Sequence, residues 1–195
     1  MTPLDTLREE ALACRKCGLC ETRTNVVFGV GNPQAKVMLI GEGPGEQEDL
    51  TGEPFVGRSG QLMDKMLAYV GLSRNTNVYI ANMVKCRPPK NRDPAPDEVC
   101  ACMEYLHQQI AILRPRIVVC VGRIAAISII DPKFRVTAQH GQFIHRGEAL
   151  YMGTFHPAAL LRNPHNKPDA MEDLLALRRK MEELALIDPD TPPIV

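Results

Sequence analysis

Four short apolar segments, each running into a loop rich in glycine or polar residues, constrain the fold of this chain most strongly. They are AKVMLIGE (35–42), NVYIANMVKC (77–86), RIVVCVG (116–122) and ALYMGTFHP (149–157). Their length and apolar character are typical of buried strands. Segments with helical periodicity alternate with them, at 4–14, 60–72, 96–115, 123–130 and 168–186. This alternation predicts an α/β fold, a mostly parallel sheet with helices on both faces.

The composition fits one ordinary globular domain. Of the 195 residues, 45% are hydrophobic and 24% are charged, which is enough for a real core. We therefore expect a single domain over 1–195 that ends in a loose tail at about 186–195. No apolar run approaches the roughly 18 residues of a membrane span, and the acidic start MTPLDTLREEAL does not resemble a secretory signal. These features predict a cytoplasmic protein without membrane contact.

The predicted sheet indicates where functional residues should lie. In open parallel sheets, ligands bind at the carboxyl ends of the strands. The loops at those ends are GEGPGEQED, NMVKCRPP, GRIAA and FHPAALLR, and they hold the unusual polar residues of the chain. Because the formal net charge is zero, any binding of nucleic acid must depend on local basic patches in such loops.

The first loop, GEGPGEQEDLTGEPFVGRSG (41–60), has glycines typical of a backbone that approaches a ligand closely. It is not a dinucleotide fingerprint, because Glu46 takes the third glycine position and Pro44 lacks a phosphate-binding N–H. Two interpretations remain: an irregular turn with solvated acids, or a pocket for a neutral or cation-forming ligand such as a sugar that becomes an oxocarbenium ion. Phe55 within it is either core packing or a platform for a planar base.

The second loop, KCRPPKNRDP (85–94), is basic and stiffened by prolines. Lys85, Arg87, Lys90 and Arg92 either form a solvated surface or contact phosphates. Asn82 precedes the loop, and its amide offers both a donor and an acceptor to a base edge. The alternative for Asn82 is a cap on local backbone.

The last loop, FHPAALLRN (155–163), places His156 at a strand end, where it can donate a hydrogen bond to an oxygen that gains charge in a reaction. Leu160 and Leu161 have two interpretations: they face the core from a helix, or they form an apolar wedge in a base stack. In the second case Arg162 would contact a phosphate.

The seven cysteines include CRKCGLC at 14–20, an arrangement that indicates metal binding in a cytoplasmic protein. Cys14 and Cys17 form a chelating pair, and the further candidates are Cys20, Cys86, Cys100, Cys102 and Cys120. Cys120 is expected in the core of a strand. Cys100 and Cys102 lie about 200° apart around a helix, so at most one of them faces a metal. Spacing alone leaves zinc and an iron–sulfur cluster open.

Four long motifs together carry a family resemblance. They are GEGPGEQEDLTGEPFVGRSGQLMDKML, NMVKCRPPKNRDP, DEVCACMEYL and HPAALLR, in that order. With them the chain resembles the family 4 uracil-DNA glycosylases, the iron–sulfur branch found in bacteria and archaea. The resemblance implies a three-layer α/β/α sandwich around a four-stranded parallel sheet. It also implies an enzyme that flips uracil out of DNA and hydrolyses its N-glycosidic bond, which starts base excision repair.

The resemblance assigns roles residue by residue. Phe55 would stack on the flipped uracil, Asn82 would read its Watson–Crick edge, and Glu48 would lie near C5, where it excludes the methyl group of thymine. Gly43 would serve the base through its backbone, at a position where many members have alanine. Glu42 would lie beside the sugar and the attacking water, and His156 would stabilise O2 of the departing base. DNA contacts are expected from Arg58, Lys85, Arg87, Leu160, Leu161 and Arg162.

The resemblance also implies a [4Fe–4S] cluster on Cys14, Cys17, Cys86 and Cys102, which leaves Cys20 and Cys100 free. We expect the cluster to hold a DNA-facing loop without taking part in bond breaking. The expected partner is single- or double-stranded DNA that contains uracil, bound by a monomer. The chain lacks the insert after GRSG of covalently trapping relatives, so turnover is expected. The competing hypotheses are a non-enzymatic iron–sulfur protein for DNA binding or electron transfer, and a nucleotide-binding oxidoreductase.

Overall fold

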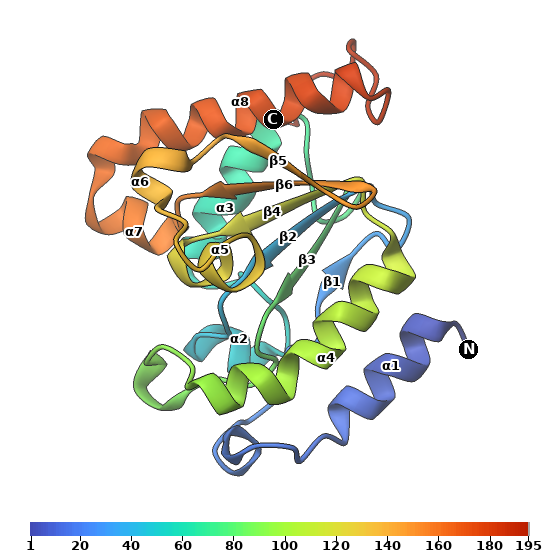
Figure 1. The fold of residues 1–195 in the computed structure, drawn as a ribbon, viewed down its shortest axis with the longest axis vertical. Helices are drawn as coiled ribbons and strands as arrows, with labels where there is room; N and C mark the ends of the chain where they lie inside the picture. Colours follow the sequence, from blue (N-terminus) through green and yellow to red (C-terminus); the bar gives the residue numbers. More distant parts are fainter. Residues whose placement is uncertain (195) are drawn as a thin grey trace.

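A six-stranded mixed sheet forms the centre of the computed structural model, which describes residues 1–194 (Figure 1). The strand order is β1-β3-β2-β4-β6-β5. The strands are β1 (Val30–Gly31), β2 (Val37–Gly41), β3 (Val78–Asn82), β4 (Ile117–Val121), β5 (Phe143–Arg146) and β6 (Ala149–Thr154). The inner four are parallel, whereas β1 and β5 pair antiparallel at the two edges. The α/β class is thus confirmed, and the expectation of only four strands is corrected to four parallel strands with two short edge strands.

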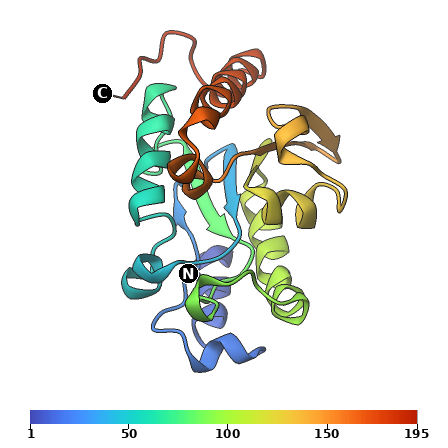
Figure 2. The ribbon, with the colours of Figure 1, turned by 90° about the vertical axis from the view of Figure 1, so that its left-hand side faces the viewer.

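The helices occupy the segments whose periodicity predicts them, with several short additions. The α-helices are α1 (Pro3–Leu12), α2 (Glu46–Thr51), α3 (Arg58–Tyr69), α4 (Pro96–Leu113), α5 (Arg123–Ile129), α6 (Val136–Gln139), α7 (Pro157–Arg162) and α8 (Lys167–Glu183). Three single turns of 3-10 helix are η1 (Gly18–Glu21), η2 (Pro89–Asn91) and η3 (Pro164–Asn166). Helices α3 and α4 lie on opposite sides of the sheet (Figure 2), which explains why every residue of β2, β3 and β4 is buried.

Local sequence signals explain where helices α1 and α4 begin. Thr2 and Asp5 form a capping box at the start of α1, in which Thr2 Oγ1 accepts from the Asp5 N–H and Asp5 accepts from the Thr2 N–H. Helix α4 has Pro96 at its first position, and Glu98 accepts a hydrogen bond from the Ala95 N–H at 2.7 Å. Helix α1 packs on α4, so the N-terminal segment is held beside the sheet although it contributes no strand.

Two hydrophobic clusters fill the molecule. The larger surrounds the sheet on both faces. The smaller lies between α1, α4 and the end of β3, and it includes Leu7, Phe28 and Tyr105 together with Cys86 and Cys102. The cysteines with metal-binding spacing therefore face this second cluster. None of the helices in residues 1–194 combines the length and apolar character that crossing a membrane requires.

The C-terminal tail is anchored over its described residues rather than loose. The Arg178 guanidinium donates to the backbone carbonyls of Asp188, Pro189 and Thr191, at 3.0–3.1 Å. The Ile194 N–H donates to the Ala68 carbonyl at 2.8 Å. These bonds tie residues 188–194 to α3 and α8, in contrast to the loose tail expected at 186–195.

Candidate active site and cysteine cluster

A cleft of about 770 Å³ opens at the carboxyl ends of the four parallel strands. The strand order places β3 on one side of β2 and β4 on the other, and open α/β sheets bind ligands outside such a reversal of order. The loops that follow β2, β3, β4 and β6 all line the cleft. Of the residues singled out in the sequence, it brings together Glu42, Gly43, Glu48, Phe55, Asn82, His156 and Arg162.

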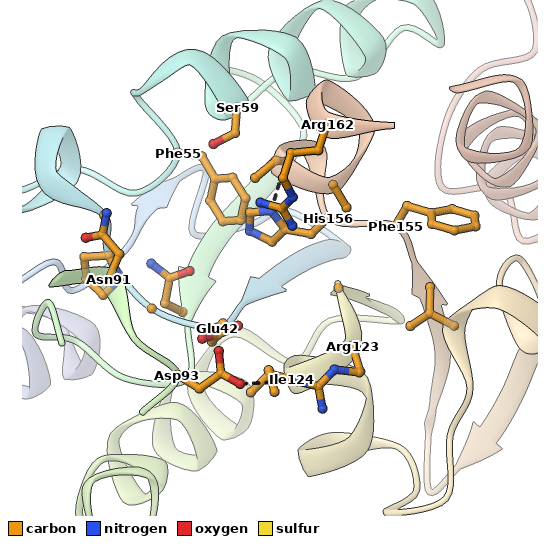
Figure 3. Close-up of a pocket in the computed structure, with 18 of the residues that line it drawn as sticks. Glu42, Phe55, Ser59, Asn91, Asp93, Arg123, Ile124, Phe155, His156 and Arg162 are labelled. Carbon is orange, nitrogen blue, oxygen red and sulfur yellow. Dashed lines mark hydrogen bonds and ion pairs between the residues drawn. The ribbon is translucent and has the colours of Figure 1, made fainter. Parts of the chain in front are cut away.

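Phe55 is held in one orientation by its surroundings. Its backbone has φ +55°, in the left-handed region that few residues other than glycine adopt. A Cβ on Gly60 would lie 1.9 Å from the Phe55 carbonyl oxygen, so only glycine fits there. The Arg74 guanidinium donates to the same oxygen at 2.6 Å. The ring lies beside the imidazole of His156, with centroids 5.8 Å apart and planes 30° apart (Figure 3).

The Glu48 carboxylate organises the loop that carries Phe55. One oxygen accepts from the N–H groups of Val56 and Gly57, each at 2.9 Å, and the other accepts from the Gly45 N–H at 3.1 Å. Glu48 is 8% exposed and lines the cleft. The structure thus gives this side chain a function that the sequence did not reveal, since its oxygens are directed to backbone donors and fix the first loop.

Asn82 ends β3 directly beside the end of β2. It pairs in register with Gly41, and a Cβ on Gly41 would come within 2.5 Å of Asn82 Oδ1 and 2.6 Å of Phe55 Cζ. Glycine at position 41 therefore leaves the space that both side chains need. Parallel pairing continues past the strands, because the N–H groups of Met83 and Val84 donate to the carbonyls of Gly41 and Glu42. Asn82 and Glu42 are thereby fixed relative to one another.

His156 is held as a neutral hydrogen-bond donor. It caps α7, and its Nδ1 accepts from the Ala158 N–H at 3.1 Å, which leaves the proton of the neutral ring on Nε2. Burial, helped by the charge of Arg162 and opposed by Glu48, lowers the pKa of His156 to about 4. The end of β6, just before His156, is held by α8, because Thr154 Oγ1 donates to the buried Asp173 carboxylate at 2.6 Å.

Glu42 lies on the wall of the cleft opposite Phe55 and His156 (Figure 3). Burial, reinforced by the negative charge of Asp93 and opposed by Arg123, raises the pKa of Glu42 to about 7. Asp93 and Arg123 form an exposed ion pair at 3.2 Å beside it. Sequence reasoning missed both residues as part of the site; the signal was present for Arg123, which follows Gly122 in the loop after β4.

The candidates for DNA contact divide into exposed and buried residues. Leu160 is 1% exposed and packs in the main core, as the helix interpretation proposed, whereas Leu161 is 39% exposed. Leu160 is therefore corrected from a wedge to a core residue. Arg58 and Arg162 are exposed, and Arg87 Nε donates to Asn91 Oδ1 at 2.7 Å at the edge of the second loop.

Comparison with known proteins identifies the family to which a chain with this cleft belongs. A family model described as the uracil DNA glycosylase superfamily matches residues 28–177. The Type-4 uracil-DNA glycosylase of Archaeoglobus fulgidus is 42% identical over 181 residues, which cover 89% of this chain and 90% of that protein. The chain belongs to the uracil DNA glycosylase superfamily. The Type-4 uracil-DNA glycosylase of Thermotoga maritima is 43% identical over 166 residues (84% and 86% covered), and a Type-5 enzyme of Pyrobaculum aerophilum is 32% identical over 146 residues (67% and 64% covered).

Cysteines line a second, smaller cavity. Cys14, Cys17, Cys86 and Cys102 line this cavity together with Cys20, and α4 contributes Cys102 and Tyr105 to it. Cys100 is exposed, and Cys120 is buried in the middle of β4. Within residues 1–194, no three cysteine, histidine or acidic side chains are arranged as ligands of a single metal ion. The structure thus brings Cys20 to the same cavity as the four predicted ligands.

Donor groups around these sulfur atoms fit a site that carries negative charge. The Lys85 N–H lies 3.2 Å from Cys102 Sγ, the Arg23 guanidinium 3.2 Å from Cys86 Sγ, and the Lys16 N–H 3.5 Å from Cys14 Sγ. Such donors stabilise the ligand sulfur atoms of iron–sulfur clusters. Burial, opposed by the charge of Lys85, raises the pKa of the Cys102 thiol to about 11, and binding of a metal would favour its thiolate. The four predicted cysteines therefore share one cavity with Cys20, and the donors around them suit the sulfur ligands of a metal cluster.

Lys85 connects the cysteines to the cleft, and its prediction as a DNA contact is wrong. The side chain is 2% exposed, and its ammonium donates to the Asn82 carbonyl at 2.7 Å and to Gln109 Oε1 at 2.6 Å. Gln109 in turn donates to the Phe28 carbonyl at 3.0 Å. Burial lowers the pKa of Lys85 to about 8. The basic loop thus begins with an internal cation that cannot reach a phosphate.

Replacing Lys85 with methionine should destabilise the fold, because the Asn82 carbonyl and Gln109 Oε1 would remain buried without their donor. We expect the free energy of unfolding in urea to fall by about 2 kcal/mol, as for other hydrogen bonds from charged groups. The same change at the exposed Lys65 of α3 should cost less than about 0.5 kcal/mol. Equal stability of Lys85→Met and the unmodified protein would show that the ammonium is not needed.

Proposed function

We propose that this protein is a uracil-DNA glycosylase that flips uracil out of DNA and hydrolyses the bond between the base and deoxyribose. The observation that carries the proposal is the convergence of Phe55, Asn82, His156 and Glu42 on one cleft in a member of this superfamily. The relatives from Archaeoglobus fulgidus and Thermotoga maritima are Type-4 uracil-DNA glycosylases, which supports the same activity. An electron carrier would need neither the Asn82 amide nor the His156 donor, so the non-enzymatic alternative is not favoured.

The side chains that would recognise the base already line the cleft in this structure. Uracil is paired inside a duplex and must be extruded before its glycosidic bond can be reached. In the cleft, the Phe55 ring offers a stacking surface and the Asn82 amide offers a donor and an acceptor for the Watson–Crick edge. The backbone of Gly43 also lines the cleft, and a Cβ at this position would approach Val84 Cγ2 to 2.7 Å. Leu161, exposed at the end of α7, is the residue left to fill the space in the base stack.

Bond breaking divides charge between the base and the sugar. The electron pair of the C1′–N1 bond leaves with uracil, and the sugar develops oxocarbenium character. The His156 Nε2–H donates to the uracil O2, where negative charge grows. The Glu42 carboxylate faces the sugar, stabilises its positive charge and orients the water whose oxygen bonds to C1′. As the new C1′–O bond forms, that water gives up one proton, and over the whole hydrolysis this proton is taken up by the uracil anion.

The cysteine site would hold the [4Fe–4S] cluster through Cys14, Cys17, Cys86 and Cys102. When bound, the cluster supplies a cross-link between the N-terminal segment, the loop after β3 and α4. The hydrolysis requires no electron transfer, so this function is structural. The loop after β3 carries Arg87, and anchoring its first residues fixes the position of that side chain beside the cleft.

Uracil release from DNA tests the proposed function directly. Incubation with single- and double-stranded DNA that contains one uracil should give free base and alkali-labile sites. His156→Ala should lower kcat by about 10²- to 10³-fold, since it removes one donor from the oxygen that gains charge. His107→Ala, an exposed position on α4, should leave the rate unchanged. No release from either substrate by the unmodified protein would refute the activity.

The pH dependence of kcat/KM should reflect Glu42. Its carboxyl has a pKa of about 7 and acts when deprotonated, so the rate should rise from pH 5 to pH 8 with a midpoint near 7. His156 is already neutral over this range. Asp93→Asn removes a negative neighbour and should move the midpoint to lower pH, whereas Arg123→Gln should move it to higher pH. A midpoint that survives in Glu42→Gln would assign the titration to another group.

Metal analysis tests the cysteine site. Protein purified without oxygen should contain iron and acid-labile sulfide in equal amounts and absorb in the visible range. Cys86→Ser should lose most of the iron, because Cys86 is buried in the cavity, whereas Cys100→Ser should retain it, since Cys100 is exposed elsewhere on α4. Zinc in place of iron would contradict the cluster.

A further inference from the structure

Three polar side chains form a network beside the strand end that carries His156, and the proposed chemistry does not use them. They are His140, Thr154 at the end of β6 and Asp173 of α8, and we call them the Asp173 network. Asp173 Oδ1 accepts from His140 Nδ1 at 2.8 Å, and Asp173 Oδ2 accepts from Thr154 Oγ1 at 2.6 Å. Asp173 and Thr154 are each 3% exposed, and all three residues lie outside the lining of the cleft.

The Asp173 network holds both residues that precede His156. Thr154 is held through its hydroxyl group, and its carbonyl accepts from the Gly122 N–H at 2.8 Å. Phe155 is held through its ring, which packs on the His140 imidazole with centroids 4.8 Å apart. Phe155 and His156 project in opposite directions from the chain (Figure 3). Contacts that fix Phe155 on one side therefore also limit where His156 can point on the other.

Two glycines let the loop, the strand and the helix meet at this carboxylate. Gly141 has φ +71°, and a Cβ there would lie 2.4 Å from Asp173 Oδ1. The Gly141 N–H donates to the Gly153 carbonyl at 3.0 Å, which ties the segment that carries His140 to β6. His140 is thus held beside Asp173 by the backbone as well as by its own side chain.

The same residue types occur in hydrolytic triads, but their arrangement here is different. In a triad the hydroxyl group donates to the imidazole, which takes its proton when the hydroxyl oxygen attacks. Here Thr154 Oγ1 donates to the carboxylate instead, and it is buried outside the lining of the cleft. The geometry fits side chains that support a neighbouring group and not a nucleophile.

We propose that His140, Thr154 and Asp173 are positioning residues, which hold the Nε2–H of His156 where the departing base gains negative charge. The inference rests on the proposed function for the reaction that His156 serves. A hydrogen-bond donor stabilises a growing charge only when it is placed correctly, and a displacement of about 1 Å can lower a rate by about 10²-fold. The Asp173 network should consequently affect kcat much more than KM, because its effect is felt in the transition state.

A pair of variants at Thr154 tests this role. Thr154→Val keeps the shape of the side chain and removes the hydroxyl donor, whereas Thr154→Ser keeps the donor. On single-stranded DNA with one uracil, Thr154→Val should lower kcat by about 10- to 10²-fold with little change in KM. Thr154→Ser should retain most of kcat. Thr6→Val, the same change at an exposed position of α1, should behave like the unmodified protein.

A double-mutant cycle shows whether the effect passes through His156. In protein that already carries His156→Ala, Thr154→Val should cause little further loss of kcat, since the group that the network positions is gone. Single-turnover assays measure these slow rates. Losses that multiply in the double variant would overturn the proposal, and so would an unchanged kcat in Thr154→Val alone.

Nitrogen NMR of the His156 ring gives a readout that needs no activity. In the unmodified protein Nδ1 accepts from the Ala158 N–H, so its shift should be that of an unprotonated nitrogen. In Thr154→Val the two ring nitrogen shifts should approach each other as both tautomers become populated, whereas in Thr154→Ser they should stay apart. Unchanged shifts in Thr154→Val would contradict the inference. If the shifts respond but the unmodified protein releases no uracil, the proposed function fails while the positioning of His156 stands.

Discussion

One buried lysine connects the cleft with the cysteine cavity. Lys85 Nζ bonds to the carbonyl of Asn82, the residue that would read the base, and the Lys85 N–H bonds to the sulfur of Cys102. An isolated ammonium in the interior would be strongly unfavourable, but this one has two oxygen acceptors and lies near thiols that would be anionic as metal ligands. Five consecutive residues, from Asn82 at the end of β3 to Cys86, thus connect the base-reading amide, the buried ammonium and the cysteine cavity.

The active-site geometry follows from backbone pairing more than from side-chain contacts. Strands β2 and β3 remain hydrogen-bonded beyond their ends, so Glu42 and Asn82 occupy fixed places on neighbouring chains. Glycine at position 41 then leaves room for the side chains of Asn82 and Phe55, and glycine at position 60 leaves room for the backbone of Phe55. A similar relation holds at Gly122, with φ +95°, where a Cβ would lie 2.9 Å from the Cβ of His156. The side chains on the wall of the cleft therefore occupy space that neighbouring glycines leave free.

Periodicity predicted the parallel strands and long helices because those signals are local. It missed β1, which has two residues, and β5, whose Phe143–Arg146 segment is half exposed and carries no clear alternation. The same limit appears in the site. Leu160 and Leu161 are adjacent, yet only one is buried, and Lys85 points inward whereas Arg87 lies at the surface edge. Whether such a side chain is buried or exposed depends on its position around a helix or on the conformation of a loop. The effect of Asp93 on Glu42 acts through space and has no sequence signature.

The strained backbone at Phe55 has a thermodynamic consequence. The left-handed conformation costs free energy at folding, and the Arg74 guanidinium, the Glu48 carboxylate and the close contact with Gly60 maintain it. The aromatic surface is consequently ordered in the free protein, so a base that reaches it loses little further conformational entropy on the protein side. If the cleft binds uracil as proposed, a base with additional bulk would meet side chains whose positions are already fixed. Selectivity would then arise during folding, before any substrate is bound.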